Sequence, residues 1–255
     1  TQKKGLKKSM TDNSQLDYKT LSIFITKNLV EPFYKDRFDK LDEIRLISVL
    51  RRKNPYLFKT KNVQTAEQLV RQILDAYLSS REETVFGTYL EQLSIHVCGL
   101  VYGGHKSAAE GIDMEFEKDG NHYLVSIKSG PNWANSSQIS KMKTNFRTAK
   151  RILGTNSKKQ NVIAINGCCY GKDGTPDKGE YLKLCGQRYW EFISGDSNLY
   201  LEMIKPLGQQ VKEKDEQFEK RYTQKVNEMT QQMLNEFCTN GLIDWEKLVK
   251  FNSGK

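Results

Sequence analysis

The stretch GIDMEFEKDGNHYLVSIKSG, residues 111–130, has the pattern of two short β-strands joined by a tight turn. Polar and apolar residues alternate on both sides of Asp119-Gly120. This dipeptide favours a two-residue hairpin turn, because both of its positions accept positive φ angles. With these residues as the loop, Asp113 lies opposite Ser126. The sequence therefore predicts an antiparallel hairpin with a fixed register.

The two faces of this hairpin differ in chemistry, because successive side chains of a strand point to opposite sides. The apolar face is expected to pack inward and the polar face to line a cleft. The polar face holds Asp113, Glu115, Ser126 and Lys128. The apolar face holds Ile112, Met114, Phe116, Val125 and Ile127.

Carboxylates and a lysine on one face allow two interpretations. One is a solvated edge with an ion pair between Asp113 and Lys128, worth about 1 kcal/mol at most. The other is a site that hydrolyses phosphodiesters. Carboxylate oxygens are ligands that Mg²⁺ selects, and a lysine beside the metal can orient water and stabilise negative charge.

The residues after the hairpin favour the hydrolytic interpretation. The chain carries a formal net charge of +9, and no Asp or Glu occurs from Gly120 to Lys172. A cluster of one sign repels itself unless an anion faces it, so a phosphate-facing surface is favoured over a solubilising face. The basic residues of this stretch are Lys128, Lys141, Lys143, Arg147, Lys150, Arg151, Lys158, Lys159 and Lys172.

The segments that follow the hairpin predict the fold class. SSQISKMKTNFRTAKRIL (136–153) has apolar residues at helical spacing, and Ser136 or Ser137 can cap its start. NVIAING (161–167) is suited to a central buried strand. Strand, helix and strand in this order imply a parallel pair. Together with the hairpin they predict an α/β fold with a mixed central sheet flanked by helices.

Helical patterns precede and follow this core. Residues 65–80 open with a Thr65–Gln68 capping box, and residues 82–97 form a further helix. An amphipathic helix at about 206–239 ends at Gly241. Its apolar residues either build a dimer or pack on their own core. They are Phe218, Tyr222, Val226, Met229 and Phe237. We expect one domain over 1–255, with an N-terminal helical part (1–62), a core (63–195) and C-terminal helices (196–255).

Composition excludes several other classes. The five cysteines form no CxxC pair, which indicates reduced thiols of a cytoplasmic protein. No apolar run reaches the roughly 18 residues of a membrane span, and the basic start lacks the apolar segment of a secretory signal. No GxxxxGK[ST] loop occurs, so no nucleotide cofactor is expected.

GIDMEF followed by VSIKSG resembles the core of the PD-(D/E)XK nucleases, which carry an Asp on one strand and acid-x-Lys on the next. Asp113 matches the first acid and Lys128 the lysine. SIKSGPNW and the Ser- and Gln-rich helix start resemble type II restriction endonucleases, with similarity over most of the chain. The resemblance implies a restriction-endonuclease-like core and Mg²⁺-dependent cleavage of double-stranded DNA. It also implies a homodimer acting at a short palindromic site, in the cytoplasm of a bacterial cell beside the nucleoid.

One position departs from the family pattern. Ser126 stands where these enzymes carry the second catalytic carboxylate, and serine cannot supply the charge. Another acid must therefore complete the metal site with Asp113. Glu91, from the preceding helix, is slightly favoured over Glu115, and the carbonyl of Ile127 is an additional candidate ligand.

Contacts with DNA are expected from two regions. Backbone phosphates would meet the start of the basic helix, because helix N-termini favour anions. These residues are Asn132, Ser136, Ser137, Gln138, Lys141, Lys143 and Arg147. Bases would be read by the loop between Tyr170 and Arg188, through Lys172, Gln187 and Arg188. Two other functions stay open, a structure-selective or repair nuclease and a DNA-binding module whose nuclease site has decayed.

Overall fold

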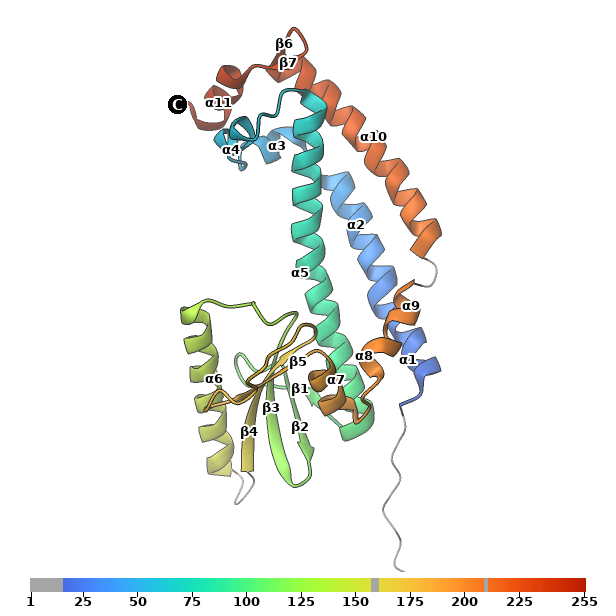
Figure 1. The fold of residues 1–255 in the computed structure, drawn as a ribbon, viewed down its shortest axis with the longest axis vertical. Coiled ribbons are helices and arrows are strands. Elements are labelled where there is room, and N and C mark those ends of the chain that lie inside the picture. The colour runs from blue at the N-terminus through green and yellow to red at the C-terminus, as the bar shows by residue number, and fades with distance from the viewer. Residues whose placement is uncertain (1–15, 157–160, 209–210) are drawn as a thin grey trace, which may run out of the picture. The chain divides into compact units, whose positions relative to one another are not determined.

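The computed structural model describes residues 16–156, 161–208 and 211–255, and it contains two compact units (Figure 1). The sheet unit consists of the described residues up to Ser22 together with Leu90–Met203. The helical unit consists of Ile23–Tyr89 and Ile204–Lys255. The predicted α/β class is confirmed, with a mixed five-stranded sheet, flanking helices and terminal helices. The division at residues 62 and 195 within one domain stays a prediction.

The sheet has the strand order β1-β2-β3-β4-β5. The first three strands pair antiparallel, whereas β3, β4 and β5 pair parallel. The carboxyl ends of three strands therefore meet at one edge, where the loops that follow them can converge. The strands are β1 (His105–Lys106), β2 (Met114–Lys118), β3 (Asn121–Lys128), β4 (Asn161–Cys168) and β5 (Leu182–Cys185).

The β2–β3 hairpin has the predicted register. Glu115 lies opposite Leu124. Asp119 and Gly120 have φ angles of 51° and 74°, so both adopt the left-handed conformation that a two-residue hairpin turn requires. Asp113 precedes the ladder, and its N–H donates to the carbonyl of Val125 over 2.9 Å. The pairing of the two chain segments thus continues to Asp113, although this residue lies outside the regular strand β2.

Helices cover both faces of the sheet. On one face, Phe116 stacks on Tyr102 and Tyr123 and meets Phe192 of α7 (Gln187–Ser194) edge-on. On the other face, fully buried Leu124 packs with residues of α6 (Ser136–Asn156). The cleft predicted along this face is therefore closed at Leu124, opposite Glu115, where α6 covers the sheet.

The predicted orientation of Ile112 is also wrong. This residue joins the cluster of Leu124 and α6 instead of the opposite apolar face. Strict alternation holds only within the ladder, and β2 begins at Met114.

The helix α6 begins with a capping box that differs from the prediction. Asn135 is the cap, because its Oδ1 accepts from the N–H of Gln138 over 3.0 Å. The side chain of Gln138 accepts in return from the N–H of Asn135 over 2.9 Å. Ser136 and Ser137 are thus the first helical residues and not the cap. Met142 and Phe146 are buried as predicted, whereas Ile152 is exposed.

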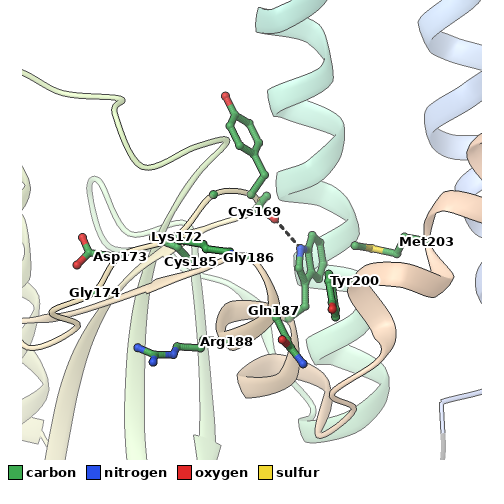
Figure 2. A pocket seen from close by; sticks show the side chains of 13 residues that line it. Cys169, Lys172, Asp173, Gly174, Cys185, Gly186, Gln187, Arg188, Tyr200 and Met203 are labelled. Atoms are coloured by element: carbon green, nitrogen blue, oxygen red, sulfur yellow. Dashed lines mark hydrogen bonds between the residues drawn. The ribbon is translucent and has the colours of Figure 1, made fainter.

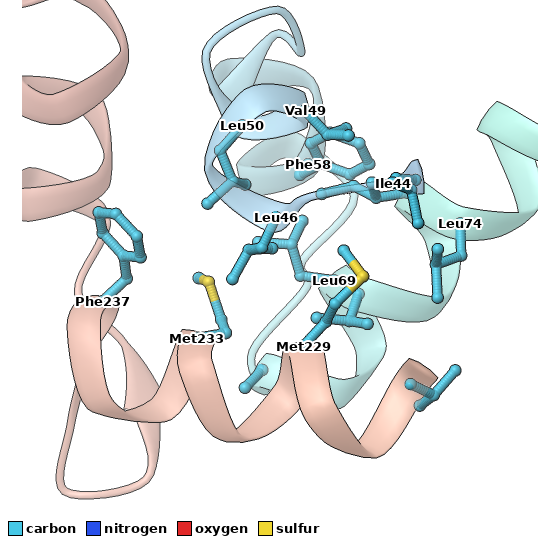
Figure 3. Packing of buried hydrophobic residues seen from close by; sticks show 14 of the residues in the cluster. Ile44, Leu46, Val49, Leu50, Phe58, Leu69, Leu74, Met229, Met233 and Phe237 are labelled. Atoms are coloured by element: carbon cyan, nitrogen blue, oxygen red, sulfur yellow. The ribbon is translucent and has the colours of Figure 1, made fainter. Parts of the chain in front are cut away.

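The helical unit has an apolar core of its own, in which Leu46 and Leu69 pack near Met229 and Met233 (Figure 3). The predicted Thr65–Gln68 capping box is present, with a 3.3 Å bond in each direction. The side chains of the C-terminal helix that were candidates for a dimer interface belong to this core. Within the described residues, no helix is long and apolar enough to cross a membrane.

Two helix boundaries differ from the prediction. The helices expected at 65–80 and 82–97 form one helix, α5 (Ala66–Tyr102), because Ser80–Glu83 contains neither proline nor a glycine cap. Gly241 does not cap the C-terminal helix. It follows Asn240 in the tight turn of a small hairpin, and both residues have positive φ angles.

The remaining elements are mostly short. They are α1 (Tyr18–Ile25), the π-helix η1 (Thr26–Val30), α2 (Glu31–Glu43), α3 (Leu46–Leu50), α4 (Pro55–Thr60), α8 (Leu199–Glu202), α9 (Ile204–Gly208), α10 (Val211–Phe237), β6 (Cys238–Thr239), β7 (Leu242–Ile243) and α11 (Trp245–Ser253).

Candidate active site

The candidate site lies at the carboxyl edge of the parallel strands. Lys128 is the last residue of β3, and Asp113 immediately precedes the antiparallel neighbour β2. The chain directions therefore bring the two residues to the same end of the hairpin. Lys128 Nζ lies 3.8 Å from Asp113 Oδ2, and about a quarter of each side chain is exposed. The pair is thus accessible to a ligand.

The carboxylate of Asp113 is held through one oxygen. Its Oδ2 accepts from the N–H of Ile127 over 2.6 Å and from the hydroxyl of Ser126 over 3.4 Å. Among the described residues, no donor is bonded to Oδ1. The aspartate is therefore fixed in place while one of its oxygens stays available.

Glu91 of α5 adds a second negative charge to this site. Burial raises the pKa of the Glu91 carboxyl, and the charge of Asp113 raises it further, against the opposing effect of Lys106 and Lys128. Lys106 Nζ lies 4.0 Å from Glu91 Oε1, and 30% of the Glu91 side chain is exposed. The two acids are therefore close enough to repel one another.

Glu115, the alternative acid, has different partners. Its Oε2 lies 3.1 Å from Nε2 of His122, and its Oε1 lies 3.6 Å from Nε2 of His105. Glu115 thus lies between two imidazoles, of which only that of His122 is within hydrogen-bond distance. The electrostatic interaction of Glu91 with Asp113 agrees with the slight preference for Glu91, which stays a prediction.

The charges fit a hard divalent cation. Two carboxylates that destabilise each other in a partly buried place are relieved by a positive ion. Mg²⁺ commonly takes one or two carboxylates and completes its shell with water and phosphate oxygens. Within the described residues, no group of three or more His, Cys, Asp or Glu could hold a metal ion. Asp113 and Glu91 would therefore need oxygen atoms from outside this set, and the carbonyl of Ile127 stays a predicted ligand.

The sequence patterns did not predict Trp133, which lies beside the lysine, or Asn166, which bonds to Trp133. Lys128 Nζ lies 5.2 Å from the centre of the Trp133 ring. The indole Nε1 of Trp133 donates to Oδ1 of Asn166 in β4 over 3.2 Å. Asn166 was a detectable signal, since a polar residue inside an otherwise apolar central strand needs a partner.

The predicted phosphate contacts fall into two groups. Asn132, Ser136, Ser137 and Lys141 are exposed around the start of α6. By contrast, Lys143 and Arg147 both pair with Glu180, at 3.2 and 2.6 Å. These two cations lower the pKa of Glu180, with the hydrogen bond from Arg147 as the larger cause. Gln138 is engaged in the helix cap.

The predicted base-reading residues Lys172, Gln187 and Arg188 line a pocket of about 720 Å³ beyond β4 and β5 (Figure 2). Gln187 also donates to the carbonyl of Ser197 over 3.1 Å. Asp173 in this lining pairs with Lys178 and Lys183. The hydrogen bonds from Lys178, from the N–H of Thr175 and from Lys183 lower its pKa to about 2. The pocket therefore offers the cations of Lys172 and Arg188 beside a paired acid.

Lys183 also links this pocket to the loop that follows Lys128. Its Nζ lies 3.4 Å from Oδ2 of Asp173 and donates over 2.9 Å to the carbonyl of Pro131. One ammonium group thus binds the loop after β4 and the loop after β3.

A mixed sheet with flanking helices, whose strand ends bring an aspartate and a lysine together, is the architecture of a restriction-endonuclease-like nuclease core. Comparison with protein families agrees, because the model of the family described as type II restriction endonuclease EcoO109I matches residues 19–215. This match covers most of the chain, so the protein belongs to the EcoO109I family of type II restriction endonucleases. It is accordingly a DNA-binding hydrolase of the nuclease class. Compared individually with curated proteins, the chain matches none.

Proposed function

We propose that the protein is a Mg²⁺-dependent type II restriction endonuclease that cleaves both strands of DNA at a short palindromic site. The observation that carries this proposal is the 3.8 Å approach of Lys128 to Asp113, with Glu91 as a second acid beside them. A structural ion pair has no use for a second carboxylate, whereas two nearby carboxylates suit Mg²⁺, which commonly takes one or two.

Each residue has a separate role in this proposal. Asp113 and Glu91 hold the cation, and the carbonyl of Ile127 adds a neutral oxygen. Bound Mg²⁺ neutralises the scissile phosphate and acidifies a water. Lys128 orients the attacking water and stabilises the negative charge that develops on the phosphate. Ser126 has a supporting role, since its hydroxyl donates to Asp113 and it carries no charge.

The DNA lies along the carboxyl edge of the sheet. Asn132, Ser136, Ser137 and Lys141 bind backbone phosphates, together with the N–H groups at the start of α6. Lys143 and Arg147 join them by exchanging Glu180 for phosphate oxygens. Bases are read by Lys172, Gln187 and Arg188. Gln138 contributes indirectly, because it fixes the helix start.

Two further features belong to the same proposal. A palindromic site presents the same bases on both strands, so a two-fold homodimer places one active site on each strand. The buried side chains of α10 pack within their own unit, and the dimer must therefore use other residues. The enzyme works in the bacterial cytoplasm beside the nucleoid, where its substrate is found.

Ser126 favours one alternative function, a DNA-binding module with an inactive site. Its side chain is 2% exposed and carries no charge, so this position supplies no carboxylate to a cation. In the proposed enzyme, Glu91 supplies the second negative charge of the metal site. If Glu91 does not supply it, the protein is the inactive DNA-binding module. A structure-selective nuclease with the same core is a further alternative.

The deciding experiment is digestion of a plasmid of known sequence with Mg²⁺ and, in parallel, with a chelator. We expect discrete fragments with Mg²⁺ and none with the chelator. Run-off sequencing then gives the site and the ends. Cleavage of branched DNA alone would indicate the structure-selective enzyme. Binding without cleavage would indicate the inactive module.

A further inference from the structure

The loop between Lys128 and α6 is tied to the end of β4 and the region after it. The N–H of Tyr170 donates to the carbonyl of Ser129 over 2.9 Å. Gly130 lies so close to the Tyr170 ring that an added Cβ would come within 2.4 Å of its Cζ. The first part of the loop is therefore closely packed directly after the catalytic lysine.

Asn166 holds the second part of this loop. It is 1% exposed and lies in register with Ser126 on the neighbouring strand. Its Nδ2 donates to the carbonyl of Ser126 over 3.2 Å, while its Oδ1 accepts from Nε1 of Trp133 over 3.2 Å. A buried amide costs stability unless its groups are paired. The two bonds thus determine the position of the indole.

The indole in turn faces the lysine. The Lys128 ammonium lies 5.2 Å from the centre of the Trp133 ring and 3.8 Å from Asp113. An aromatic ring attracts a cation at this distance through its negative face. A lysine has a flexible four-carbon stem with substantial rotamer entropy, so a ring on one side restricts where its ammonium can go.

We propose that Trp133 is a positioning residue, which holds the Lys128 ammonium beside Asp113 and is itself fixed by Asn166. This inference rests on the proposed function of Lys128. It adds an aromatic residue that acts on the chemical step without touching the scissile phosphate.

The test compares the full-length wild type with Trp133→Leu and Trp133→Phe. Leucine removes the aromatic face, whereas phenylalanine keeps a smaller ring face and loses the pyrrole part of the indole with the N–H that bonds Asn166. The rate is measured on a plasmid that the wild type cuts, under single-turnover conditions with Mg²⁺. Affinity for the same DNA is measured separately with a chelator, and melting temperatures check the fold.

We expect Trp133→Leu to slow the cleavage step about tenfold with little change in DNA affinity. Trp133→Phe should recover most of the rate, to within about threefold of the wild type. If Trp133 had only a structural role, its substitution would lower the melting temperature, and the cleavage rates of the two variants would not differ in this way. Equal rates for Trp133→Leu and the wild type would overturn the proposal. So would equally slow rates for both variants, or a loss of affinity that matches the loss of rate.

A second measurement does not depend on cleavage. In protein labelled at the lysine ε-carbons, the Lys128 signal is assigned by its disappearance in Lys128→Ala. The Trp133 ring should shift this signal away from the other lysines, and Trp133→Phe should retain part of the shift. An unshifted Lys128 signal overturns the proposal even if Trp133→Leu fails to fold. A wild type that cuts no DNA refutes the proposed function, whereas a cutting wild type with an insensitive Trp133 refutes only this inference.

Discussion

Two carboxylates of the β2–β3 hairpin region, Glu115 and Asp113, differ in the side chains that surround them. Glu115, within the ladder, has an imidazole at each oxygen, His122 at 3.1 Å and His105 at 3.6 Å. Asp113, just outside the ladder, has a second acid nearby and a lysine at 3.8 Å. Glu115 thus has partners from its own sheet at both oxygens. The repulsion between Asp113 and Glu91 at an accessible strand end supports the cation that we propose there.

The largest effect is expected from removing the lysine at the open end of the hairpin. Lys128→Ala should reduce the single-turnover cleavage rate by about 10²–10³, because one preorganised charge at the reacting phosphate is worth that much. Lys220→Ala, at an exposed position of α10, is the matched control and should cleave like the wild type. If Lys128→Ala cleaves DNA at the wild-type rate, Lys128 has no catalytic role and only forms an ion pair with Asp113.

A direct test of the comparison is to neutralise each acid separately. Glu91→Gln should lower the Mg²⁺-dependent rate about 100-fold, since it removes a proposed metal ligand. Glu115→Gln should stay within about threefold of the wild type, because its partners are imidazoles of the neighbouring strands β1 and β3. Cleavage rates over a Mg²⁺ titration measure both. The reverse order of effects would assign the second acid to Glu115.

A third carboxylate extends the comparison to DNA binding. Glu180 is paired with Lys143 and Arg147, so Glu180→Gln should release two cations toward phosphate. Affinity for any DNA sequence should rise several-fold, and the slope of log affinity against log salt should steepen by up to about 2. Salt titrations of binding with a chelator measure this. An unchanged slope would mean that these two residues do not face DNA.

The smallest effect concerns stability and pH. The pKa of Glu91 is raised in the folded protein, so the folded state binds its proton more tightly than the unfolded state does. Stability therefore falls as the pH rises from the unfolded pKa through the folded one. Glu91→Gln should melt slightly higher than the wild type at neutral pH, on the order of 1–2 °C.

Melting curves with and without Mg²⁺ check this prediction. The difference between the two proteins should vanish in acid, where wild-type Glu91 is protonated in both states. Added Mg²⁺ should raise the melting temperature of the wild type more than that of Glu91→Gln, because a ligand stabilises the state that binds it. A lower melting point for the variant at neutral pH would contradict the inferred repulsion between Glu91 and Asp113.

The local pattern of the sequence predicted the fold where one element decides its own geometry. Asp119-Gly120 determines the hairpin register, because few other residues accept two successive positive φ angles. The helix spacing after residue 136 likewise predicted a helix that packs on the sheet. Boundaries were harder to predict, since Asn135 competes with two adjacent serines for the cap and only the folded backbone decides between them.

Local pattern related only those site residues that are close in sequence, and it left Glu91 and Glu115 as two open choices for the second acid. Asp113 and Lys128 belong to one hairpin, so alternation along the strands relates them. Glu91, Trp133 and Asn166 come from three other segments. Their approach depends on strand order and on helix packing, which no local pattern specifies. Glu180 was missed for the same reason, because it pairs with α6 across a long separation in sequence.

The double attachment of Lys183 has a consequence for how the enzyme could discriminate between substrates. Its single ammonium group joins Asp173, in the wall of the pocket, to Pro131, two residues before the tryptophan that faces Lys128. The two loops therefore cannot be displaced independently without breaking one of these bonds. In the proposed enzyme, a DNA sequence that displaces the pocket wall would also displace the loop beside Lys128, so a poor fit would lower the cleavage rate as well as the affinity.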